Sequence, residues 1–79
     1  MKDRTGFVFK VRGYGLVGEV FHKDKNNGRY QINYYGDYAD YEEGVIYETY
    51  DVLPETLENN ISNGHYIPID EWFDTLKAY

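Results

Sequence analysis

Apolar and polar residues alternate over residues 6–12 and 16–23, and this pattern predicts two neighbouring strands. The core face of the first strand carries Phe7, Phe9 and Val11. In the second strand the alternation is interrupted at Gly18. A glycine inside a strand is typical of a β-bulge or a tight bend. We therefore expect a bulge at Gly18 that makes this strand bend.

Two further strands are predicted over residues 29–35 and 45–50, which are rich in β-branched and aromatic residues. An Asn27-Gly28 pair separates the second strand from the third and is a strong hairpin signal. Alternation places one set of residues of the third strand in the core: Tyr30, Ile32 and Tyr34. In the fourth strand it points Tyr47 inward, and Glu48 and Tyr50 outward.

The last third of the chain predicts shorter elements. Residues 54–60 suit one or two helical turns, and residues 65–69 a short strand that Pro68 restricts to an edge or an end. A helix is expected over residues 70–79, with Asp70 as its N-cap. Its apolar face must dock on the rest of the chain or on a partner, because so short a helix is marginal alone. The residues expected to dock it are Trp72 and Phe73.

Short, bent strands joined by glycine turns predict a mainly β fold, a small barrel of about five strands with a short C-terminal α-helix. Three stretches, GYGLVGEV (13–20), NGRYQINY (27–34) and YDVLP (50–54), resemble the SH3-like barrel class, in particular KOW-type and related small bacterial and phage domains. We expect one domain over residues 1–79, with the barrel core at 6–54 and an added turn, strand and helix at 55–79.

Composition excludes several kinds of site. Cysteine is absent, which removes disulfides and thiolate ligands. The two histidines, His22 and His65, lie far apart and not in a metal-ligand spacing, so we expect neither a metal nor a cofactor. No apolar run approaches the length of a membrane span, and the first residues lack the apolar stretch of a signal peptide. A cytoplasmic protein is therefore expected.

Charge is divided unevenly along the chain, whose formal net charge is −6. Residues 1–29 hold seven basic and three acidic residues, a balance of +4, whereas residues 30–79 hold one basic and eleven acidic residues, a balance of −10. Residues 34–51 are the extreme, with six tyrosines, six carboxylates and no basic residue. Such a division of charge orients approaching partners.

Residues 34–51 therefore predict a binding surface. We expect residues 36–44 to form an exposed loop, because this stretch is too acidic to lie in the core. Its tyrosines favour binding, since exposed tyrosine offers rigid contact area at low entropic cost. The predicted partner-binding residues are Tyr35, Asp37, Tyr38, Asp40, Tyr41, Glu42, Glu43, Glu48 and Tyr50. The adjacent Glu42 and Glu43 lack the buried surroundings that acid–base catalysis needs, and we expect no enzyme.

Two functions remain open at this point, besides a role as a subunit whose C-terminal helix pairs with another chain. In the first, the acidic tyrosine-rich surface engages a basic protein and imitates nucleic acid, as small acidic phage-type inhibitors do. In the second, the basic first hairpin binds nucleic acid, as the KOW-type resemblance implies. The residues of that alternative site are Lys10, Arg12, Lys23, Lys25 and Arg29.

Overall fold

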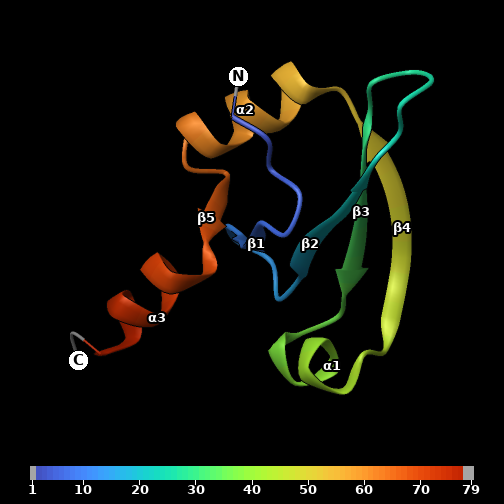
Figure 1. The fold of residues 1–79 in the computed structure, drawn as a ribbon. Coiled ribbons are helices and arrows are strands. Elements are labelled where there is room, and N and C mark those ends of the chain that lie inside the picture. Colours follow the sequence, from blue (N-terminus) through green and yellow to red (C-terminus); the bar gives the residue numbers. More distant parts are fainter. Residues whose placement is uncertain (1, 78–79) are drawn as a thin grey trace.

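Five antiparallel strands form one open sheet in the computed structural model, which describes residues 2–77 (Figure 1). The strands are β1 (Val8–Val11), β2 (Val17–Lys23), β3 (Tyr30–Tyr35), β4 (Ile46–Val52) and β5 (Tyr66–Pro68). Their order across the sheet is β4-β3-β2-β1-β5. The mainly β class and the strands are confirmed. The sheet does not close, because β4 and β5 lie at its opposite edges.

In the described residues, 2–77, three helices accompany the sheet: α1 (Tyr38–Glu43), α2 (Pro54–Ser62) and α3 (Ile69–Lys77). Figure 1 shows α2 across one end of the sheet and α1 at the opposite end, with α3 extending away from β5. The C-terminal helix is confirmed, but it begins at Ile69. Asp70 therefore lies in the first turn and is not the N-cap expected from the sequence. Residues 78 and 79 of the expected helix lie outside the described residues.

The turn between β2 and β3 confirms the hairpin signal. Gly28 has a φ of 73°, a backbone conformation that side-chain-bearing residues rarely adopt. Its N–H donates to the carbonyl of Asp24, and the N–H of Asp24 donates to the carbonyl of Arg29. The hairpin fixes the register of β2 on β3, in which Val20 lies opposite Ile32.

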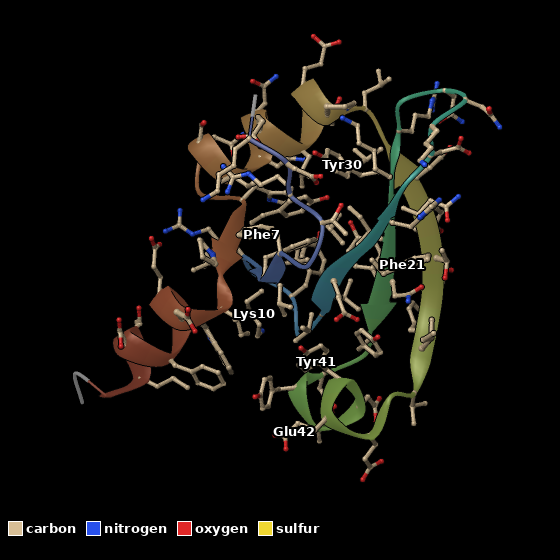
Figure 2. The ribbon with its side chains drawn as sticks, in the orientation of Figure 1. Phe7, Lys10, Phe21, Tyr30, Tyr41 and Glu42 are labelled. Carbon is tan, nitrogen blue, oxygen red and sulfur yellow. The ribbon has the colours of Figure 1, made fainter. Side chains whose placement is uncertain are left out.

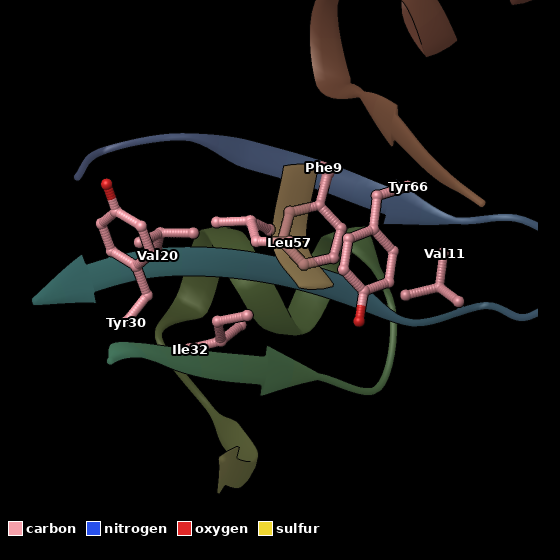
Figure 3. Close-up of a cluster of buried hydrophobic side chains, with 7 residues drawn as sticks. All are labelled: Phe9, Val11, Val20, Tyr30, Ile32, Leu57 and Tyr66. Atoms are coloured by element: carbon pink, nitrogen blue, oxygen red, sulfur yellow. The ribbon is translucent and has the colours of Figure 1, made fainter. Parts of the chain in front are cut away.

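The ring of Phe9 occupies the centre of the main core, where Gly18 makes room for it. Phe9 and Gly18 lie opposite each other on β1 and β2, and a Cβ on Gly18 would come within 2.3 Å of the ring. The ring stacks on Tyr66 with its centroid 4.2 Å away. Figure 3 shows this pair among the other buried residues of the core: Val11, Val20, Tyr30, Ile32 and Leu57.

The bulge expected at Gly18 lies elsewhere. The register of β2 on β3 shifts between Val20 and His22, two residues later. Gly18 remains in regular pairing with Phe9 and Tyr34. The glycine is therefore required by the close approach of an aromatic ring, which is the second common reason for glycine inside a strand.

The N-terminal segment is tied to α2 by a bidentate ion pair. Arg4 Nε donates to Glu58 Oε2 at 2.7 Å, and Arg4 Nη2 donates to Glu58 Oε1 at 2.9 Å. The backbone N–H of Arg4 also donates to the Tyr30 hydroxyl at 3.0 Å. α2 in turn inserts Leu57, which is fully buried, into the core. Together these contacts fasten the first residues and α2 over one end of the sheet.

None of the helices within residues 2–77 combines the length and the apolar character that crossing a membrane requires.

Gly18→Ala should lower the free energy of unfolding by about 1–3 kcal/mol, because the new methyl group overpacks the Phe9 ring. Chemical denaturation measures the change. In a Phe9→Leu background the same substitution should cost less, since the smaller side chain leaves room. Equal costs in the two backgrounds would contradict the ring contact as the cause.

Arg4→Gln should remove about 1 kcal/mol of stability at neutral pH, a modest value because both side chains are partly exposed. The hydrogen bonds that Arg4 donates to Glu58 hold the pKa of this carboxylate below its ordinary value of 4.5. The pair therefore contributes fully above that value, and its contribution is lost as pH falls through the lowered pKa. Denaturation of the native chain should show this loss of stability between neutral and acidic pH. The Glu58→Gln variant, which has no carboxylate to protonate at this position, should not show it.

Candidate functional site

A groove lined by tyrosines opens on the core face of the sheet, beside β4. Its volume is about 360 Å³. We call it the tyrosine groove, after Tyr14, Tyr34, Tyr47, Tyr50 and Tyr66. The rest of its lining consists of Val11, Leu16, Ile32, Glu48, Asp51, Val52 and His65. An apolar hollow with a few polar groups at its rim is the usual form of a binding site.

The floor of the tyrosine groove is held by a hydrogen bond between two hydroxyl groups. Tyr34 and Tyr66 approach to 3.0 Å between their hydroxyl oxygens, from β3 and β5. Burial raises the pKa of Tyr34 well above its ordinary value, with a further contribution from the hydrogen bond to Tyr66. The Tyr34 side chain therefore stays neutral across the physiological range.

The rim of the tyrosine groove is open to solvent. Tyr47 and Tyr50 on β4 are 65% and 55% exposed, and Tyr14, in the turn between β1 and β2, is 64% exposed. The Tyr50 ring packs edge-on against Tyr34 at 6.1 Å between centroids. The neighbouring Glu48 carboxylate, two residues earlier on the same strand, raises the pKa of Tyr50. This combination of aromatic faces and a carboxylate suits a cationic side chain.

The faces of β4 differ from the sequence expectation. Tyr34 lies opposite Glu48 and Tyr35 opposite Ile46, so Tyr47 is an extra residue at a bulge. Glu48 and Tyr50 consequently lie on the core side of the sheet, at the open groove, and not on its outer face. The inward position expected for Tyr47 is wrong, because its side chain is mostly exposed.

Exposed carboxylates lie on β4 and on the two helices next to it in the sequence, α1 and α2. We call this set the acidic strip: Glu42, Glu43, Glu48, Asp51 and Glu55. Its basic neighbour is Arg29, 3.8 Å from Asp51, and both side chains of that pair are about half exposed. An exposed pair of this kind contributes little. Two members of the strip, Glu48 and Asp51, line the tyrosine groove and bring nearly uncompensated negative charge to it.

The expected loop over residues 36–44 is a short helix, α1. The side chain of Asp37 caps it by accepting from the backbone N–H of Asp40 at 2.8 Å, and Gly44 ends it in the left-handed conformation. The carboxylate of Asp37 is thus engaged within the helix. Glu42 and Glu43 are exposed in the last turn, where the helix dipole disfavours negative charge. Figure 2 shows Glu42 on the outer side of α1.

Three of the tyrosines expected on the binding surface pack against the chain itself. Tyr35 is only 5% exposed, and its hydroxyl donates to Glu19 Oε1 at 3.1 Å. Tyr41 lies on the sheet side of α1 with its ring 5.2 Å from that of Tyr35 (Figure 2). Tyr38 packs edge-on against Phe73 of α3 at 5.0 Å. These residues form a second aromatic cluster.

The docking residues expected in the C-terminal helix lie in this second cluster. Trp72 lies 6.2 Å from Tyr38 between ring centroids, and Lys10 of β1 stands 5.2 Å above its ring. α3 therefore packs on its own chain through Trp72 and Phe73.

The basic residues of the alternative site are divided. Lys23, Lys25 and Arg29 are exposed on the β2–β3 hairpin. Lys10 donates to the carbonyl of Tyr14 at 2.7 Å and lies over Trp72, while Arg12 follows β1 near Gly64. The structure therefore brings three of the five together.

Sequence reasoning missed Tyr14 and Tyr66 as parts of the candidate site. Tyr14 stands between Gly13 and Gly15, and such a turn exposes the residue that it carries, so the signal was present. Tyr66 joins the groove only through the pairing of β5 with β1, which the sequence does not reveal. Within residues 2–77 no group of three or more potential ligands is placed to hold a metal ion.

Tyr34→Phe should make the protein less sensitive to alkaline unfolding. Because the folded-state pKa of Tyr34 is raised, the unfolded chain releases this proton first, from its ordinary value of 10.0. Stability is therefore full below that value and falls as pH rises above it, by up to about 1.4 kcal/mol per pH unit. Denaturation across this range measures the slope. Tyr47→Phe at the exposed rim is the control, and equal slopes in both variants would contradict the burial of Tyr34.

Comparisons of the chain with protein-family models, with curated proteins and with solved structures found no match.

Proposed function

We propose that this chain is a small, non-enzymatic protein-binding module that engages a basic surface of a partner. The observation that carries the proposal is the tyrosine groove, whose lining includes Glu48 and Asp51 of the acidic strip. Tyrosine is enriched at protein interfaces because it offers a large, rigid contact area with a polar end. Carboxylates around such a patch favour partners of positive charge and speed their approach.

The proposed surface keeps part of the set expected from the sequence and exchanges the rest. Glu42, Glu43, Glu48 and Tyr50 remain in it. Exposed Tyr14 and Tyr47 replace the three tyrosines that pack in the second aromatic cluster. The placement of Glu42 and Glu43 also supports binding, because charges that oppose a helix dipole cost stability and are tolerated where function benefits.

The module is further proposed to be an SH3-like barrel that is incomplete between β4 and β5. Five short antiparallel strands with a register shift in β2 support this assignment. A basic nucleic-acid-binding protein is one partner of the right charge, and the acidic strip would then imitate a phosphate backbone, as in phage-type inhibitors. The proposal places the protein in the cytoplasm, where such partners are abundant.

Direct binding of nucleic acid has less support. Three cations on one hairpin supply few phosphate contacts, and the acidic strip repels phosphate. A gel shift at low salt and micromolar protein should therefore show no complex. A shift that Lys23→Gln and Lys25→Gln abolish would favour the nucleic-acid alternative over the protein partner.

Affinity capture from the native source, at low and high salt, tests the proposed function. The native bait should retain a basic protein at low salt and release it at high salt. A bait with three substitutions in the acidic strip, Glu42→Gln, Glu43→Gln and Glu48→Gln, should no longer capture the basic protein. A control bait with three substitutions on α3, Asp70→Asn, Glu71→Gln and Asp74→Asn, should still capture it. The two variants change the charge equally. Equal capture by both, or a partner that is not basic, would overturn the proposal.

A further inference from the structure

β4 is an edge strand with one free side. Within residues 2–77 it pairs with β3 and with no other strand. In an antiparallel pair only alternate residues direct their N–H and C=O groups to the neighbour. The remaining residues of β4 turn these groups away from β3, and residues 46–51 are all exposed.

The two edges of the sheet differ in how they are protected. β5 has only three residues and ends at Pro68, which has no N–H to donate. β4 has seven residues and contains neither proline nor lysine. Its exposed apolar side chains include Ile46, Tyr47 and Tyr50. β4 carries a bulge at Tyr47 and the exposed carboxylates of Glu48 and Asp51, so its free edge is a template for pairing chiefly with a segment of opposite charge.

We propose that the free edge of β4 binds an extended basic segment of the partner as an added strand. This inference rests on the proposed function and specifies how the partner is held. Backbone hydrogen bonds to β4 would supply affinity, and pockets for alternate side chains would supply specificity. The tyrosine groove is such a pocket, since Glu48 and Tyr50 of β4 line it.

Charge selects a basic segment over a second copy of this chain. Two β4 strands paired antiparallel around Glu48 would place that carboxylate directly opposite its copy in the other strand. Like charges opposed across a strand pair are destabilising. The net charge of −6 opposes self-association further. An arginine or lysine in the same place would instead meet carboxylates and the faces of the tyrosine rings.

The geometry also fixes the spacing of the basic residues. Side chains of an added strand alternate between the two faces of the sheet. Those that reach the tyrosine groove must therefore come from every second residue of the segment. Arginines at positions i and i+2 should bind better than the same arginines placed next to each other.

Synthetic peptides test this mode. The probe is an acetylated, amidated heptapeptide of alternating threonine and arginine, and its control has the same composition with the arginines contiguous. Binding to the full chain is measured by NMR titration, which also locates the affected amides. The alternating peptide should bind more tightly and shift the amides of residues 45–52.

Backbone methylation separates strand pairing from simple charge attraction. Two further peptides carry N-methyl groups, one on the arginine amides and the other on the threonine amides. Because only one set of amides faces β4, one peptide should lose at least about tenfold in affinity and the other little. Equal effects of the two methylations would overturn strand addition, while binding that still depends on Glu48 would leave the proposed function standing.

Protein variants complete the test. Glu48→Gln with Tyr50→Ala should weaken the alternating peptide by about tenfold, while Glu71→Gln with Asp74→Asn on α3 should not. All four side chains are exposed, so the variants keep their fold. No binding of either unmethylated peptide, or equal binding by both variants, would overturn the strand addition and the proposed function together.

Discussion

The packing of the Phe9 ring into the space that Gly18 leaves is the contact on which the rest of the structure depends. It holds β1 against β2 at the centre of the sheet, and the same ring stacks on Tyr66 of β5. One aromatic side chain thereby joins elements that are almost sixty residues apart in the sequence. A chain of 79 residues without disulfides has few other means of closing so long a loop.

With β5 fixed next to β1, β4 is left at the opposite edge, and the aromatic residues divide into three groups. One fills the core, a second fastens α1 and α3 to the outer face of the sheet, and the third remains open around the tyrosine groove. The first two groups account for stability by burying apolar area. The third group is exposed beside uncompensated carboxylates, and stability does not explain it. This contrast is the reason for placing function at β4.

The sequence was sufficient for the strands, the hairpin at Gly28 and the C-terminal helix, because each has a local signal. Two local signals were misread: Asp37 and Gly44 are good helix caps, yet the acidic residues between them suggested a loop. The faces of β4 were not predictable, since one bulged residue, Tyr47, reverses the alternation of the whole strand. The candidate site proposed here therefore lies on the segment that the sequence indicated, but several of its residues lie on the other side of the sheet from the one expected.

The central claim is that β4 of the free protein has an unpaired edge, and amide hydrogen exchange measured residue by residue tests it most directly. The amides of β4 that donate to β3 should be protected, and the alternate amides should exchange rapidly. Protection of every β4 amide in the free protein would contradict the claim, because it would mean that something already covers this edge.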